Sequence, residues 1–224
     1  MTMTATTFLQ LAVRAGRGDW NAIETALRNI GTMGGNSQLV GTNTAFGTDA
    51  LKANTTGANS VAVGYQALDA NTVGDKNVAV GSGAMGANTT GTTSVAVGHQ
   101  ALLLQTIGTG NTAVGSTALD ALTTANNCTA VGLDALGGVT TGIDNTAVGK
   151  DAGKAITTAT GNTLVGKGAG DVITTGSNNT AAGRDALGAN TTGASNTAFG
   201  KDAALLNTTG AGITALGTQA LDAN

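Results

Sequence analysis

Few residues in this chain could perform catalysis or bind a metal ion. The 224-residue sequence contains one histidine, His99, and one cysteine, Cys128. A serine–histidine–carboxylate triad would have to use His99, and a zinc site needs several cysteine or histidine ligands. No G-x-x-x-x-G-K-[ST] sequence is present that could form a phosphate-binding loop. The sequence therefore predicts no catalytic residue, no metal site and no cofactor, and we do not expect an enzyme.

Charged residues are sparse, at 10% of the chain, and the net charge is -3. This balance gives no electrostatic reason to expect a nucleic-acid partner. No segment has the roughly 18 apolar residues of a membrane span, and the N-terminus lacks the basic region of a secretory signal. We therefore expect synthesis in the cytoplasm and no membrane partner.

Four aspartates at position 7 of the repeat lie beside four cations at position 6, and this pattern indicates a solvated stripe, not an active site. They are Asp134, Asp151, Asp185 and Asp202, with Lys150, Lys167, Arg184 and Lys201.

The chain is organised by a repeat of 17 residues that continues without insertion or deletion. The unit reads N-T-A-V-G-x-x-A-L-x-A-N-T-T-G-x-x from Asn43 onward, and its positions are numbered here from 1 to 17. Residues 43–224 hold ten complete units and twelve residues of another. A glycine stands at position 5 of every unit. These repeat glycines are Gly47, Gly64, Gly81, Gly98, Gly115, Gly132, Gly149, Gly166, Gly183, Gly200 and Gly217.

A strict repeat of this length indicates the stacked coils of a solenoid, because every unit must contact its neighbours in the same way. The segment N-T-A-V alternates and contains residues that favour strands, and glycines at positions 5 and 15 mark turns. We therefore predict an all-β protein, a parallel β-solenoid or β-roll with one coil per unit. Each coil is expected to contain two short strands and two turns, with about 4.8 Å between coils.

The small residues of the unit predict a narrow interior. Position 8 is alanine throughout, and position 3 is alanine in every unit except one, which has Leu164. Position 9 is usually leucine, but where it becomes Gly153 or Gly170, position 12 becomes Ile156 or Ile173. Close packing requires lost volume to return nearby. We infer that the side chains of positions 9 and 12 share one packed space.

The environments of three polar positions can also be predicted. His99 occupies position 6, whose residue type varies widely, so we expect an exposed side chain. Cys128 replaces the asparagine or serine of position 1, which predicts a small buried substitute. Position 13 is threonine in all ten complete units. Such a row resembles the flat face of ice-binding solenoids. A face with two rows of threonine would need the spacing T-x-T, whereas here the second threonine is usually at position 14, and adjacent strand residues face opposite sides. We favour a hydrogen-bond ladder within the turns.

One coil stack made largely of alanine is expected to be marginally stable. Ordering the backbone costs about 1–2 kcal/mol per residue, whereas one buried valine or leucine returns about 1.5–3 kcal/mol. Several chains packed side by side would bury the valine and leucine rows as a second core. Three chains around one axis form a closed arrangement. We therefore predict that the protein binds itself as a homotrimer.

The repeated segments N-T-A-V-G and S-V-A-V-G, with A-L and N-T-T-G between them, resemble the head repeats of phage tail fibres. They are also similar to the head repeats of trimeric autotransporter adhesins. The resemblance covers residues 43–224 and implies a trimeric left-handed parallel β-roll. It favours a structural protein of a bacteriophage virion, made in the host cytoplasm, as a fibre or spike that contacts a receptor on the host surface. The alternatives are a capsid cement or decoration protein, a bacterial surface adhesin head and, more distantly, an ice-binding solenoid.

Residues 1–42 lie outside the repeat and predict a capping or anchoring segment. Asp19 to Ile30 has the pattern of a short amphipathic helix. The helix would dock onto another virion protein, cover the open end of the first coil, or do both. The candidate attachment residues on its apolar face are Trp20, Ile23, Leu27 and Ile30.

Overall fold

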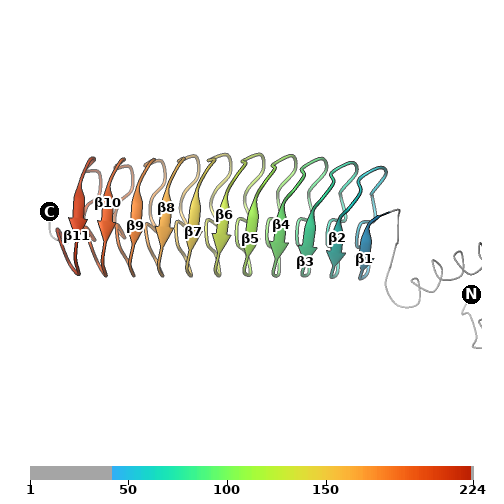
Figure 1. The fold of residues 1–224 in the computed structure, drawn as a ribbon, viewed down its shortest axis with the longest axis horizontal. Coiled ribbons are helices and arrows are strands. Elements are labelled where there is room, and N and C mark those ends of the chain that lie inside the picture. The colour runs from blue at the N-terminus through green and yellow to red at the C-terminus, as the bar shows by residue number, and fades with distance from the viewer. Residues whose placement is uncertain (1–41, 223–224) are drawn as a thin grey trace, which may run out of the picture.

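The computed structural model describes residues 42–222, in which eleven three-residue strands occur and no helix (Figure 1). The strands are β1 (Thr44–Phe46), β2 (Val61–Val63), β3 (Val78–Val80), β4 (Val95–Val97), β5 (Thr112–Val114), β6 (Thr129–Val131), β7 (Thr146–Val148), β8 (Thr163–Val165), β9 (Thr180–Ala182), β10 (Thr197–Phe199) and β11 (Thr214–Leu216). The predicted helix near residues 19–30, with its four candidate attachment residues, lies outside the described residues.

All eleven strands form one parallel sheet whose order follows the chain from β1 to β11. Each strand residue pairs with the residue 17 positions later, as Ala45 does with Ala62 and Ala62 with Ala79. The coils therefore stack in strict register along a straight rod (Figure 1). The predicted parallel β-solenoid with one 17-residue coil per unit is confirmed.

The prediction of two strands per coil is wrong, because each coil has a single strand. The rest of the coil consists of turns in which positions 7, 9 and 17 adopt left-handed backbone conformations. In the second coil these are Gln66, Leu68 and Lys76, with φ of 54°, 52° and 57°. The turns still bond from coil to coil, since Leu51 N–H donates to the carbonyl of Ala67 at 3.0 Å. The second wall is thus held by turn-to-turn hydrogen bonds instead of a second sheet.

The glycine of position 5 follows each strand and is required by the backbone. Gly132 has a φ of 140°, a backbone conformation that residues with a side chain rarely adopt. In addition, a Cβ placed on Gly132 would lie 2.5 Å from the carbonyl oxygen of Gly149. All eleven repeat glycines have positive φ, between 122° and 146°. The glycine row therefore lets the chain turn out of the sheet while neighbouring coils stay in contact.

The core lies inside the single coil stack. The alanines of positions 3 and 8 are buried, apart from the partly buried Ala220 in the last unit, as the narrow interior predicted. The leucines of position 9 in the complete units, such as Leu68 and Leu136, are also buried within one chain. The prediction that the leucine row contributes to a second core between chains is therefore wrong. At position 9 the backbone is left-handed, and the leucine side chain lies inside its own coil.

The predicted exchange of volume between positions 9 and 12 is confirmed. Ile156 and Ile173 are fully buried. A Cβ placed on Gly153 would lie 3.2 Å from Ile156 Cδ1, and one on Gly170 would lie 2.7 Å from Ile173 Cδ1. Leu164 fills the same space from position 3, because its methyl carbons would lie 2.8 Å and 3.0 Å from those two Cβ atoms. The larger side chains occupy the volume that the two glycines leave.

A column of buried polar side chains runs along position 1. Asn43 Oδ1 accepts the N–H of Ser60 at 2.8 Å, and its Nδ2 donates to the carbonyl of Gly57 at 2.6 Å. Cys128 joins the column: its N–H donates to Asn111 Oδ1 at 2.9 Å. It is buried and free, so the predicted small buried substitute is confirmed. Burial raises the pKa of the Cys128 thiol, which keeps it in its neutral form.

Candidate functional site

The residues that could do chemistry are not brought together in the described part of the chain. His99 is exposed, as predicted from its variable position. Residues 42–222 contain no group of three or more histidine, cysteine, aspartate or glutamate side chains that could hold a metal ion. Nor does this range include a helix that could cross a lipid bilayer.

The threonines of position 13 form a hydrogen-bond ladder, as predicted. Each hydroxyl donates to the carbonyl of the equivalent threonine one coil later, over distances of 2.8–3.3 Å. The ladder runs from Thr55 to Thr208 and stabilises the turns that replace a second sheet. The donor hydrogens of these hydroxyls are therefore engaged with the backbone of the next coil.

The predicted charged stripe is a solvated surface with paired charges. Lys150 lies 3.4 Å from Asp151, and Lys201 lies 3.1 Å from Asp202. The three cations that pair within this stripe, Arg184 among them, expose about half of their side chains. Exposed pairs of this kind are worth little, about 0–1 kcal/mol. The stripe is therefore a solvated surface of the rod that adds little to its stability.

Asp134 of the stripe and the nearby Asp120 have opposite electrostatic environments. The hydroxyl of Thr117 and the ammonium group of Lys154 hold the pKa of Asp134 below its usual value. Burial, together with the nearby Asp134 charge, raises the pKa of Asp120. This difference reflects local hydrogen bonding and desolvation. Within residues 42–222 the two carboxylates are not part of a group of three or more possible metal ligands.

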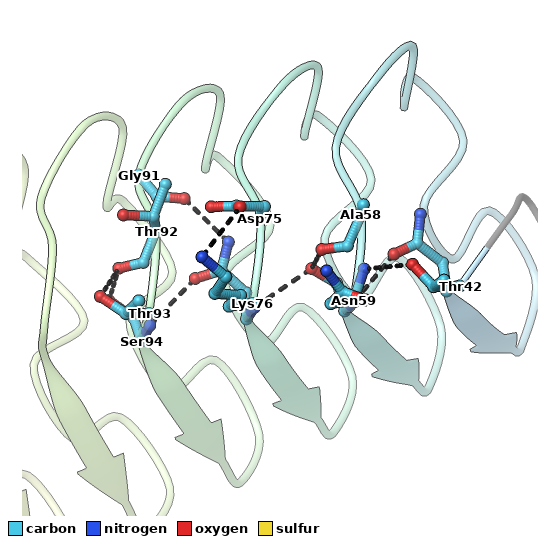
Figure 2. Close-up of polar contacts among 12 residues, drawn as sticks. Thr42, Ala58, Asn59, Asp75, Lys76, Gly91, Thr92, Thr93 and Ser94 are labelled. Atoms are coloured by element: carbon cyan, nitrogen blue, oxygen red, sulfur yellow. Dashed lines mark hydrogen bonds and ion pairs between the residues drawn. The ribbon is translucent and has the colours of Figure 1, made fainter.

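Polar groups at positions 16, 17 and 1 link the turns above the strands in the first coils (Figure 2). Asn59 N–H donates to Thr42 Oγ1 at 2.9 Å, and Lys76 lies 3.5 Å from Asp75. Ser94 Oγ donates to the carbonyl of Thr92 at 3.3 Å. No buried side-chain nitrogen or oxygen among the described residues lacks a hydrogen-bond partner. The buried polar side chains of these residues are thus fully hydrogen-bonded.

The outer face of the sheet differs from these surfaces because it is uncharged and largely apolar. Position 3 faces the core, so positions 2 and 4 of each strand face outward. Together they form the outer sheet face. Position 2 contributes Thr44, Val61, Val78, Val95, Thr112, Thr129, Thr146, Thr163, Thr180, Thr197 and Thr214. Position 4 contributes Phe46, Val63, Val80, Val97, Val114, Val131, Val148, Val165, Ala182, Phe199 and Leu216. We regard this face as the candidate interaction surface.

The apolar side chains of the outer sheet face remain accessible in the single chain. Phe46 is 67% exposed, Phe199 43% and Val148 38%. With about 4.8 Å between strands, the row is roughly 50 Å long, and three residues make it about 10 Å wide. The strip covers about 500 Å², and its position 4 row is apolar throughout while its position 2 row is threonine in eight of the eleven strands. Depletion of charge is typical of the centre of a protein interface.

Sequence reasoning found part of this surface. The valine row was expected to lie between chains, and the structure places it on the outside of one chain, where a partner could reach it. The threonine and valine row of position 2 was missed as a member of the same face. Its signal was the T-A-V alternation, in which a buried central alanine requires both neighbours to face outward.

Comparison with known proteins gave no match to a family model, a curated protein or a solved structure.

Proposed function

We propose that this protein is a non-enzymatic structural element of a bacteriophage virion, in which the solenoid acts as a rigid rod. The repeat motif supports this role by its resemblance to phage fibre heads. The regular hydrogen bonding from coil to coil supports it mechanically, because every coil is held to the next by the sheet and by the turn ladders. Residues 1–42 would attach the rod to other virion proteins, and the rod would contact a receptor on the host surface.

The apolar side chains of the outer sheet face support the proposal that the rod is a homotrimer. Three chains that turn this face toward a common axis would remove its valines and phenylalanines from water and form a second core. The charged stripe at positions 6 and 7 would remain outside that core, at its rim. Burial of apolar surface at about 25 cal/mol per Å² makes such association favourable. The strip's footprint of about 500 Å² is about three fifths of the roughly 800 Å² that each partner of a stable complex buries.

Size-exclusion chromatography with multi-angle light scattering tests the assembly directly. We expect a particle of three times the 21.5 kDa chain mass. A Val131→Lys variant, which places a charge in the centre of the outer sheet face, should dissociate into smaller species. Its control is Thr141→Lys, which changes an exposed residue away from that face. A folded monomer of the unaltered chain at micromolar concentration would remove the homotrimer.

Immunogold labelling or cryo-electron microscopy of phage particles tests the virion role. Label on the tail or its fibres supports a fibre or spike, whereas label over the capsid supports a cement or decoration protein. Both results place the protein in a virion. Label on no particle, combined with labelling of bacterial surfaces, would overturn the virion role in favour of an adhesin.

A further inference from the structure

We infer that Tyr65 and His99 form a slot that holds one sugar ring of a glycan on the host surface. They are the only tyrosine and the only histidine of the chain, and both occupy position 6, in the second and fourth coils. Ser82 occupies the same position in the coil between them. This role rests on the proposed contact with a host receptor, and it adds the chemical class of that receptor and the residues that bind it.

The third coil, which separates the two rings, has the smallest side chains of the ten complete coils along this edge. Its positions 6, 7, 10 and 11 hold Ser82, Gly83, Gly86 and Ala87. Every other complete coil has a side chain larger than serine at one or more of these positions. Leu103 covers Gly86, since its Cδ1 would lie 3.4 Å from a Cβ placed there, so the opening is confined to positions 6 and 7. Tyr65 is 54% exposed and His99 is exposed, so both rings are accessible beside this low coil.

Backbone hydrogen bonds between the coils fix the distance between the two rings. Gly83 N–H donates to the carbonyl of Tyr65 at 2.8 Å, and Gln100 N–H donates to that of Ser82 at 2.9 Å. With about 4.8 Å between coils, the Cα atoms of Tyr65 and His99 lie about 9.6 Å apart. A flat ring in contact with another ring on each side needs about 7–8 Å, twice the contact distance of about 3.5–4.0 Å. The spacing of two coils therefore admits one ring between the side chains, whereas the spacing of one coil would not.

Amide and hydroxyl groups lie at the base of the slot. A Cβ placed on Gly83 would lie 3.5 Å from Gln100 Cγ, so the Gln100 side chain passes over the glycine in the coil of Ser82. Gln66 follows Tyr65 at position 7 of its coil. Each amide offers donors and an acceptor, and the serine hydroxyl offers both. These groups can pair with the hydroxyls of a sugar while its C–H face lies against the electron-rich face of an aromatic ring.

The charge of this edge distinguishes a sugar from other ring-shaped ligands. Positions 6 and 7 of the second to fifth coils hold no lysine, arginine, aspartate or glutamate, whereas each of the seventh to tenth coils has a cation at position 6. A nucleic acid needs cations for its phosphate groups. An aromatic side chain of a protein offers at most one polar atom to the amide and hydroxyl groups of the slot. A neutral hexopyranose has a ring of the right thickness and several hydroxyls, so it satisfies both conditions.

Nuclear magnetic resonance of the unaltered chain tests the slot, because a single histidine gives one set of imidazole signals. The probes are the methyl pyranosides of glucose, galactose, mannose and N-acetylglucosamine. A single ring is expected to bind with a dissociation constant of about 1–10 mM, and at least one of the four sugars should shift the His99 signals in a saturable way. No shift with any of them, or a larger shift with N-acetyltyrosine amide, would overturn the sugar slot.

Exchanges at position 6 test the two rings and the space between them, since this position already accepts serine and tyrosine in other coils. Tyr65→Ser and His99→Ser should each weaken binding about fivefold, because each removes one stacking face. Ser82→Tyr should abolish binding although both rings remain, because the new side chain fills the slot. Its control is Ser116→Tyr, which places the same side chain on the other side of His99 and should leave binding unchanged. Saturation-transfer signals of the sugar measure all four, and equal effects of the two tyrosine exchanges would overturn the slot.

These results are separable from those on the virion role. Positions 6 and 7 stay outside the proposed core between chains, so the sugar reaches the slot in a monomer and in a trimer alike. A protein that is labelled on virions and binds none of the sugars would overturn the glycan slot and leave the virion role standing. Sugar binding that depends on Tyr65 and His99, by a protein found on no particle, would support the slot and overturn the virion role.

Discussion

At the scale of single residues, the coil depends on backbone conformations that most side chains avoid. Positions 7, 9 and 17 are left-handed in every complete coil, and they are often occupied by residues other than glycine, such as Leu68 and Lys76. Each of these costs about 1–2 kcal/mol relative to a right-handed conformation. The repeat tolerates the cost because the same geometry lets leucine reach the core and lets each turn bond to the next.

Position 5 tolerates no side chain at all, which gives the first prediction. Gly132→Ala should lower the free energy of unfolding by at least about 2 kcal/mol, since the new Cβ would clash with the Gly149 carbonyl in a strained backbone. Chemical denaturation measured by circular dichroism checks this value. The control is Gly110→Ala at position 17, where other coils carry side chains and where about 1 kcal/mol is expected. Equal losses in the two variants would contradict the prediction.

The aspartates at the edge of the rod give a prediction about pH. The pKa of Asp120 is raised, so its charged form disfavours folding at neutral pH, and protonation relieves this as the pH falls through the raised value. Asp120→Asn should therefore raise the thermal midpoint at pH 7, and the gain should vanish in acid. Asp134, whose pKa is lowered, has the opposite sign. Asp134→Asn should lower the midpoint at pH 7, and its effect should also vanish once both states are protonated at low pH.

Thermal scans between pH 3 and pH 8 distinguish these two aspartates. A stabilising effect of Asp120→Asn that persists unchanged at pH 3 would mean that the carboxylate charge is not its cause. The magnitudes should be modest, because both groups are partly exposed and water screens their interactions.

At the scale of the element, each coil is a packing unit whose volume is shared with its neighbours. Leu164 and the glycines around it show that a large side chain can move from position 9 to position 3 if the adjacent coils make room. The structural requirement is therefore the filled volume between coils, and not a leucine at one fixed position.

A double-mutant cycle tests this coupling. Leu164→Ala should cost about 2–5 kcal/mol, because it leaves a cavity between two glycine-containing coils. Gly170→Ala alone should also destabilise, since its Cβ would lie 3.0 Å from Leu164 Cδ2. The double variant should lose less than the sum of the two single variants, by about 0.5 kcal/mol or more, because the shorter residue 164 makes room for the methyl group. Strict additivity in denaturant unfolding would show that the two sites do not share a space.

The sequence was informative about everything that the repeat encodes directly. An uninterrupted 17-residue period and the T-A-V alternation were sufficient to predict parallel coils, the buried alanines and the threonine ladder. The single strand per coil could not be predicted, because residues such as Gln66 and Lys76 carry no local signal for a left-handed backbone. The burial of Leu68 inside its own chain depends on that same backbone. The outer sheet face was only half predicted, since threonine at position 2 is equally compatible with a solvated row.

At the scale of the whole molecule, stability is expected to depend on protein concentration. If three chains share a second core, mass action favours the folded trimer at higher concentration. The thermal midpoint should therefore rise over a hundredfold increase in concentration, as measured by circular dichroism or calorimetry. The Val131→Lys variant should lose this dependence while Thr141→Lys keeps it. A midpoint of the unaltered chain that does not change with concentration would contradict a dissociating trimer.

The strict register between coils also has a genetic consequence. Removal or duplication of seventeen codons within the solenoid would shorten or lengthen the rod by about 4.8 Å and keep the backbone register between the remaining coils. Unequal recombination between such similar stretches of coding sequence could therefore adjust the reach of the protein in small, equal steps. Natural variants of this chain are expected to differ in length by whole multiples of that step, with insertions of other sizes excluded because they would break the alignment of every later coil.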